Sequence, residues 1–246
     1  MKRAVLLLPL FLLGACAPTA PPAAAPAPST TADAELPLSL RWFRASAEAH
    51  AAYLQAYRGA SEHVRAIAPS LAGSDWGVIL DADETVLDNS AYELRRARAG
   101  LGYSEESWNA WVREQAAPAL PGAVAFTQLV KELGGRVVIV TNRAAAVCPE
   151  TRANLLRDSI PAAVVLCARE GSSDKNPRFQ AVQQGSVPGI PALKVVMWVG
   201  DNIQDFPGLT QAEMRSAPAS AFAEFGRSWW ILPNPLYGSW EKNPVP

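Results

Sequence analysis

The sequence has few of the residues that build nucleic-acid sites and Cys/His metal centres. It contains no cluster of lysine and arginine, and its 22 basic side chains are balanced by 23 acidic ones, which gives a net charge of −1. A nucleic-acid polymer is therefore not an expected partner. Only two histidines are present, His50 and His63. Because both fall in a helical apolar pattern, surface or packing roles are favoured over metal ligation.

The amino-terminal apolar run is too short to span a bilayer. It covers residues 4–13, follows a basic Met1-Lys2-Arg3 start and precedes small residues, which is the pattern of a secretory signal. The Leu-Gly-Ala-Cys sequence that ends at Cys16 resembles a bacterial lipobox. That resemblance implies cleavage after residue 15 and lipidation of Cys16, whereas an ordinary signal peptide with an incidental cysteine is the alternative. More than one acyl chain would anchor the protein stably.

These features predict the organisation of the chain. Residues 1–15 are expected to be the signal peptide of an exported bacterial lipoprotein, at the outer membrane or cell surface, and a periplasm-facing orientation stays open. Residues 16–36 carry the lipidated cysteine and a Pro/Ala-rich stretch with almost no charge, which is typical of an extended tether. Residues 37–246 have the length of one domain with an accessory element.

Strand-like and helical patterns alternate after a predicted helix over residues 41–69. Short apolar β-type runs occur at 76–80, 136–140, 162–166, 195–199 and 229–232. Helical spacing of apolar residues occurs between them, at 122–133, 149–159 and 177–184. This alternation predicts an α/β fold, with a Rossmann-like parallel sheet and helices on both of its faces.

Polar residues follow the predicted strands and should converge at one edge of the sheet. Asp81 and Asp83 leave the first strand, and because residues two apart in extended chain point the same way, both acids should face one small volume. Two such charges need a cation or a proton. The other polar residues are a Thr-Asn-Arg sequence at 141–143, Lys175, Asp201 and Asp205. This set suits the joint binding of a divalent cation and a phosphate.

Four motifs in this order make the resemblance to a family specific. D-A-D-E-T, T-N-R, the lysine before N-P-R-F, and G-D-N-x-x-D-F resemble the motifs of the haloacid dehalogenase superfamily of phosphatases. The wider text, including D-E-T-V-L-D-N-S-A-Y and I-L-P-N-P-L-Y-G-S-W-E, resembles the class C acid phosphatases, the lipoprotein e family of bacterial surface nucleotidases. The match runs from about residue 42 to residue 241. It implies the haloacid dehalogenase fold with a small, mainly helical cap.

The resemblance also implies a mechanism. Asp81 would be the nucleophile that forms an aspartyl-phosphate, and Asp83 would protonate the leaving alcohol and then accept a proton from water. Mg²⁺ or another divalent cation would be held by Asp81, the backbone carbonyl of Asp83, and Asp201, with Asp205 acting indirectly or through water. An acid two residues after the nucleophile argues against dehalogenation, whose displacement needs neither a protonated leaving group nor a metal.

The remaining site residues are implied for substrate binding. Thr141 and the backbone amide of Asn142 would bind the phosphoryl oxygens, and Lys175 would offset the charge of Asp81 and phosphate. A cap insertion is expected at about residues 88–120, where the superfamily places such elements. Aromatic residues there and in the tail would stack on a nucleobase, with Trp111 and Tyr237 as candidates, although ordinary core packing is the alternative for each.

Cys148 and Cys167 are expected to form a disulfide. Export favours oxidation, and neighbouring parallel strands lie about 4.8 Å apart. Cys148 opens the helix after the second strand and Cys167 ends the third, which would bring the two within bridging range. Two reduced thiols that pack as small apolar groups are the alternative.

The predicted function is a metal-dependent acid phosphatase that acts on phosphomonoesters, with 5′-nucleotides as the expected substrates. The alternatives are a broad-specificity surface phosphatase without nucleotide preference and a non-catalytic, lipid-anchored binding protein. The expected partners are a small phosphomonoester and, through the lipid anchor alone, a membrane. The oligomeric state stays open, with a homodimer as one alternative.

Overall fold

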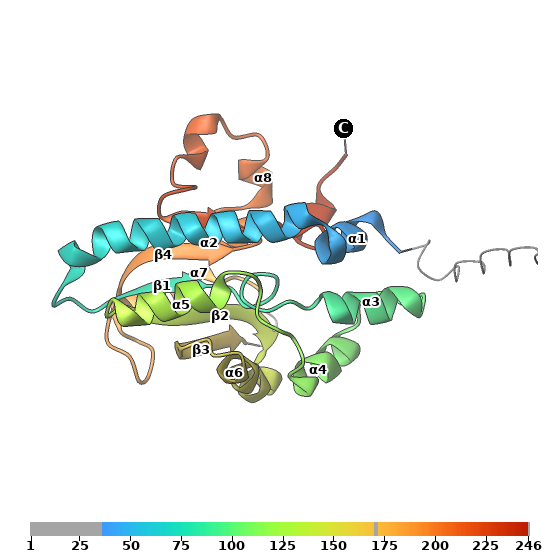
Figure 1. Ribbon diagram of the computed structural model, residues 1–246, viewed down its shortest axis with the longest axis horizontal. Helices are drawn as coiled ribbons and strands as arrows, with labels where there is room; N and C mark the ends of the chain where they lie inside the picture. Colours follow the sequence, from blue (N-terminus) through green and yellow to red (C-terminus); the bar gives the residue numbers. More distant parts are fainter. Residues whose placement is uncertain (1–35, 170–171, 246) are drawn as a thin grey trace, which may run out of the picture. The chain divides into compact units, whose positions relative to one another are not determined.

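The chain forms a five-stranded parallel sheet, in a computed structural model that describes residues 36–169 and 172–245 (Figure 1). The strand order is β3-β2-β1-β4-β5, and every neighbouring pair is parallel. This confirms the predicted fold class. The strands are β1 Trp76–Leu80, β2 Arg136–Ala144, β3 Ala162–Ala168, β4 Lys194–Gly200 and β5 Trp229–Ile231. The predicted signal peptide, Cys16 and nearly all of the predicted tether lie outside the described residues.

Alternate side chains of the central strands enter two separate apolar clusters. Val78 and Leu80 belong to a cluster with buried residues of α2 Ala47–Ile67, α5 Ala123–Glu132 and α6 Cys148–Arg157. Ile79, between them, belongs to a second cluster with residues of α7 Asn176–Gln184. Because successive side chains of a strand point to opposite faces, these clusters show that helices cover both faces of the sheet, as expected.

The amino-terminal helix is broken where a single helix over residues 41–69 was expected. The structure has α1 Leu38–Ala45 followed by α2. Ser46 lies between them in an extended conformation, and its side chain accepts a hydrogen bond from the backbone N–H of Ala49 at 3.0 Å. Serine is a favoured residue at a helix start because its hydroxyl satisfies a free N–H there. The apolar pattern continues across this cap and conceals it.

Two helices, α3 Ser90–Arg98 and α4 Glu105–Glu114, fill the segment where a cap was expected. They lie beyond the carboxyl end of β1 in Figure 1. Their aromatic side chains pack together, with the ring centroids of Tyr92 and Trp108 5.1 Å apart. The short elements are η2 Ala68–Leu71, η3 Ala145–Val147, η4 Ile203–Asp205, α8 Gln211–Met214, η5 Ala219–Phe222 and η6 Ser239–Lys242.

Cys148 and Cys167 are joined by a disulfide, with their Cα atoms 6.0 Å apart. Cys148 begins α6 and Cys167 lies in β3, so the bond ties the carboxyl end of β3 to the helix that follows β2. Among residues 36–169 and 172–245, no helix has the combined length and apolarity that a bilayer crossing requires.

Candidate active site

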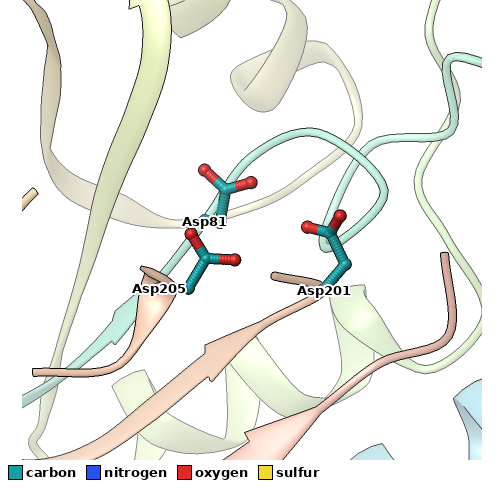
Figure 2. Close-up of side chains that lie close together, drawn as sticks. All are labelled: Asp81, Asp201 and Asp205. Carbon is teal, nitrogen blue, oxygen red and sulfur yellow. The ribbon is translucent and has the colours of Figure 1, made fainter. Parts of the chain in front are cut away.

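Three carboxylates meet where the carboxyl ends of β1 and β4 lie side by side. Asp81 follows β1, and its backbone N–H donates to Val199 O at 3.0 Å, while Asp201 follows β4. Asp205 ends the short helix η4. One carboxylate oxygen from each lies within 4.8 Å of the others, and Figure 2 shows the three side chains converging. The chain leaves β1 and β4 toward opposite edges of the sheet, which is where open α/β folds bind ligands.

The backbone around Asp205 explains why this acid lies so close to β4. Asn202 caps η4 and donates its backbone N–H to Asp205 Oδ2 at 2.9 Å. A Cβ atom at Gly200 would lie 2.3 Å from the Cβ of Asp205, a separation that no side chain could tolerate. Glycine at position 200 therefore permits the approach of Asp205 to the cluster.

Lys175 reaches the cluster from the loop before α7. Its Nζ lies 2.5 Å from Asp81 Oδ1 and 2.6 Å from Asp205 Oδ1, and the side chain is only 4 % exposed. Burial alone would lower the pKa of Lys175. The charges and hydrogen bonds of Asp205 and Asp81 raise the pKa by more than burial lowers it, so that it lies above its ordinary value. The ammonium therefore stays charged and offsets part of the negative charge.

One ammonium does not neutralise three clustered acids, of which Asp81 and Asp205 are buried and Asp201 is half-buried. Burial raises the pKa of Asp81 to about 7, with Asp205 and Asp83 adding to the rise against the opposing effect of Lys175. Burial, Asp205 and Asp81 also raise the pKa of Asp201 well above its ordinary value. A divalent cation at this position would stabilise the ionised forms of both acids and so oppose both shifts.

The donor set fits such a cation. The three side chains supply carboxylate oxygens, which are the ligands that Mg²⁺ and Ca²⁺ prefer. Asp201 is also held in orientation, because its Oδ1 accepts from Thr85 Oγ1 at 3.0 Å and its Oδ2 accepts from Asn234 Nδ2 at 2.8 Å. Both oxygens of Asp205 also have protein partners, Lys175 Nζ and the backbone N–H of Asn202.

Asp83 lies beside the cluster and pairs with a buried arginine. Arg143 NH2 lies 2.7 Å from Asp83 Oδ1, and the arginine side chain has no exposed surface. Asn89 Nδ2 donates to the same oxygen at 2.9 Å. The sequence motifs contain Arg143 and Asn89, but no role in the site was expected for either. Their contacts with Asp83 are not visible in the sequence because they depend on how distant segments pack.

The predicted phosphate-binding residues lie at the end of β2. Thr141 is buried, and its Oγ1 accepts from the backbone N–H of Arg143 at 3.1 Å. Asn142 is exposed, and its side-chain oxygen accepts from Arg178 at 2.6 Å. Arg178 also donates to Thr141 O at 2.5 Å. This arginine, which sequence reasoning missed, therefore connects α7 to the loop beside the carboxylates.

A cavity of about 580 Å³ opens over these groups. Its charged lining includes Asp81, Asp83, Lys175, Asp201 and Asp205. The other residues that line the cavity come from the cap, the carboxyl end of β2, the segment around η4 and the carboxyl-terminal tail. They are Glu93, Tyr103, Trp108, Asn142, Arg143, Asn202, Gln204, Leu236, Tyr237 and Glu241.

Trp108, rather than Trp111, presents its ring to this cavity. Tyr237 lines the cavity as expected for a substrate contact, but Trp111 is 3 % exposed and donates its indole N–H to Asn89 Oδ1 at 2.8 Å. The expectation that Trp111 contacts substrate is therefore corrected. The two tryptophans lie three residues apart on α4, and the docking of the helix decides which one faces the cavity.

The long helix α2 supports the loop that carries the first two aspartates. Tyr53 donates its hydroxyl to Glu84 O at 2.6 Å, and Tyr57 donates to Thr85 O at 2.7 Å. Glu84 has a φ of +51°, which is rare for a residue with a side chain. Tyr237 donates its hydroxyl to the buried Glu84 carboxylate, so the tail is fastened to the same loop. The four-residue spacing of Tyr53 and Tyr57 was the one signal for this contact in the sequence.

Comparisons with known proteins agree with this geometry. Residues 24–240 match the model of the HAD superfamily, subfamily IIIB (acid phosphatase). The chain is similar to the class C acid phosphatase from Bacillus anthracis in two solved structures. One has tungstate bound and aligns with 28 % identity, and the other aligns with 29 % identity; both have a TM-score of 0.74. Each alignment covers 82 % of this chain and 85 % of the other.

Proposed function

The chain belongs to subfamily IIIB of the HAD superfamily and is a phosphomonoester hydrolase of the acid phosphatase type, and from this premise we propose that it hydrolyses 5′-nucleotides with a divalent cation and Asp81 as the nucleophile. The observation that carries the proposal is the cluster of Asp81, Asp201 and Asp205 with Lys175, all of which line the cavity. The crystal structure of the related phosphatase with tungstate, a tetrahedral oxyanion like phosphate, supports the same chemistry.

Asp81 attacks phosphorus through a carboxylate oxygen. The hydrogen bonds to its side chain within the described chain fall on Oδ1, where Lys175 binds, and this leaves Oδ2 for the attack. The new bond joins Asp81 to phosphorus, and the bond from phosphorus to the leaving oxygen breaks. The ammonium of Lys175 offsets the charge that would otherwise repel the phosphate dianion.

Asp83 transfers the protons. It lies two residues after Asp81, lines the same cavity and is 15 % exposed at its side chain. In the first half of the reaction it gives a proton to the leaving oxygen. In the second half it takes a proton from the water that attacks the aspartyl-phosphate, and phosphate and free Asp81 are regenerated.

The cation is proposed to be Mg²⁺, which when bound neutralises charge on the phosphoryl group. Asp81 and Asp201 would hold it with the backbone carbonyl of Asp83, and Asp205 would fix Lys175 and act through water. Thr141 and the backbone amide of Asn142 would orient the phosphoryl oxygens. The residues proposed to bind the cation and the phosphoryl group thus lie at the carboxyl ends of β1, β2 and β4, together with Lys175.

Two aromatic residues of the cavity support a nucleotide substrate. Trp108 and Tyr237 come from the cap and the tail and line one cavity with the carboxylates. Stacking on such rings contributes about 1–3 kcal/mol per base and tolerates different bases. A broad-specificity phosphatase would share the chemistry of the carboxylates but gain little from these two rings.

A panel of rates tests the proposal. Hydrolysis of p-nitrophenyl phosphate and of several 5′- and 3′-nucleotides is measured with Mg²⁺ and with EDTA, for the wild type and for Asp81→Asn. EDTA and Asp81→Asn should each reduce activity to less than about a hundredth. Asp75→Asn is the matched control, because Asp75 precedes β1 at the opposite end of the strand.

The outcomes separate the parts of the proposal. A preference for 5′-nucleotides that Trp108→Ala and Tyr237→Ala abolish supports the nucleotide site. Equal kcat/KM for all esters would favour the broad-specificity alternative. Activity that survives EDTA dialysis, or Asp81→Asn at more than about a hundredth of the wild-type rate, would contradict the metal or the nucleophile.

A further inference from the structure

Two donors fix the orientation of the Asn89 side-chain amide. The indole N–H of Trp111 donates to Asn89 Oδ1 at 2.8 Å, and Arg143 NH2 donates to the same oxygen at 3.0 Å. An indole N–H and a guanidinium can only donate, so this side of the amide must carry the oxygen. The NH₂ group of Asn89 then has to point the other way, toward Asp83.

The same amide helps to hold one oxygen of Asp83. Asp83 Oδ1 accepts from Asn89 Nδ2 at 2.9 Å and from Arg143 Nε at 2.8 Å. All the side-chain hydrogen bonds found for Asp83 within the described residues fall on Oδ1. Its Oδ2 is thus left for groups outside the protein, while rotation of the carboxylate is restrained by two donors.

We propose that Trp111 is a positioning residue for Asp83, which acts through the Asn89 amide to keep Asp83 Oδ2 directed to the leaving oxygen of the substrate. The inference rests on the proposed proton-transfer role of Asp83. It gives α4 two tasks: Trp108 lines the cavity, and Trp111, one turn further along the helix, orients the acid. It also explains why an indole, rather than any large apolar ring, lies at a buried position of the cap.

The effect should depend on the leaving group. A poor leaving group such as an alkoxide needs the proton, whereas p-nitrophenolate leaves with little help. Trp111→Phe keeps an aromatic ring at this position, although a smaller one, and removes the N–H donor. We expect kcat/KM to fall about tenfold for an alkyl phosphate and less than about twofold for p-nitrophenyl phosphate. Both esters are measured on the same preparation, so the ratio is independent of the folded fraction.

Tyr92→Phe is the matched control. Tyr92 is buried in the same cap, its hydroxyl bonds with Ser107 Oγ at 2.9 Å, and its ring packs on those of Trp108 and Trp111. The substitution removes one partly buried hydrogen bond of the hydroxyl and leaves the backbone bond from Tyr92 N–H to Asn89 O in place. It should leave the ratio of the two kcat/KM values unchanged, even if it lowers the melting temperature.

A double-mutant cycle tests whether Trp111 acts through Asn89. Asn89→Leu removes the donor to Asp83 and should lower the alkyl phosphate rate more than Trp111→Phe does. The double variant should be no worse than Asn89→Leu alone, because residues that act in series are not additive. Independent, additive losses would overturn the proposed connection.

Asp83→Asn in the same assays separates the role of Asp83 as the acid from the role of Trp111 as a positioning residue. If Asp83→Asn shows the leaving-group dependence and Trp111→Phe does not, the positioning role is wrong and the role of Asp83 stands. If Asp83→Asn loses both esters equally, Asp83 is not the acid, and the positioning role of Trp111 is overturned with it. A selective loss in both variants, absent in Tyr92→Phe, supports the proposal.

Discussion

At the scale of single residues, the acids of the site are buried where their ionised forms are unfavourable without a cation. The raised pKa of Asp81, about 7 instead of 3.8, means that the folded protein binds a proton that the unfolded chain releases. The stability that this proton contributes is complete below pH 4 and is lost as pH rises to about 7. Asp201, whose pKa is also raised, acts in the same direction.

Metal binding should therefore stabilise the protein more at neutral pH than in acid. With EDTA, we expect the contribution of these acids to the melting temperature to fall between pH 4 and pH 7. With Mg²⁺ at about a hundred times its Kd, the gain at pH 7 should be about 2.7 kcal/mol, and it should be smaller at pH 5, where protons compete. Calorimetry checks this, and Asp201→Asn should remove most of the gain. A gain that is larger in acid would contradict the proposed ligands.

Lys175 provides a second test at this scale. Lys175→Met keeps the length of the side chain but removes the ammonium that contacts Asp81 and Asp205. We expect kcat to fall by about 10²-fold or more, because charge on the phosphoryl group loses a fixed partner. Lys194→Met, at an exposed position of β4, should leave kcat within about twofold of wild type. Equal effects of the two substitutions would show that Lys175 has no special role.

At the scale of elements, the disulfide links two segments that carry site residues. Cys148 follows the Thr141–Arg143 segment, and Cys167 precedes the loop that holds Lys175. The closed loop has a sequence separation of 19, for which the chain-entropy model gives a stabilisation of about 3 kcal/mol.

The folded domain should consequently contain no free thiol from Cys148 or Cys167. Thiol counting on the denatured, unreduced protein checks this, and two free thiols would contradict it. Replacement of both cysteines by serine should lower the free energy of unfolding by about 3 kcal/mol. Urea denaturation of the variant and of the wild type, with and without reductant, measures the difference; the variant should not respond to the reductant.

Local sequence patterns could predict the strands and part of the site, but not every contact within it. Branched apolar runs that end in polar residues located the strands and placed Asp81 and Asp201 at one edge, because parallel strands share that edge. The break at Ser46 escaped prediction because the apolar pattern continues through it. The contacts of Arg143 and Asn89 with Asp83 depend on how separate segments pack, and the choice of Trp108 over Trp111 depends on how α4 docks. No local pattern encodes either.

At the scale of the whole molecule, the amino-terminal sequence and the disulfide support the proposal of an exported lipoprotein. Cys16 lies outside the described residues, and its lipidation rests on the Leu-Gly-Ala-Cys sequence. Cys16→Ser should release the protein from the membrane fraction or leave it unprocessed, because the acyl chains that would anchor it can no longer be attached. Fractionation and immunoblotting check this. A cleaved Cys16→Ser product that stays in the membrane would contradict the anchor.

The proposed mechanism requires that Asp81 becomes phosphorylated during each turnover. The most direct measurement is acid quenching of the enzyme during steady hydrolysis of p-nitrophenyl phosphate, whose leaving group needs little help from Asp83, followed by mass spectrometry of its peptides. We expect one added phosphoryl group on the peptide that contains Asp81, with a smaller amount in wild type than in Asp83→Asn, where hydrolysis of the intermediate lacks its base. The label should be absent in Asp81→Asn. A phosphoryl group on another residue, or none at any quench time in the Asp83→Asn variant, would contradict the account.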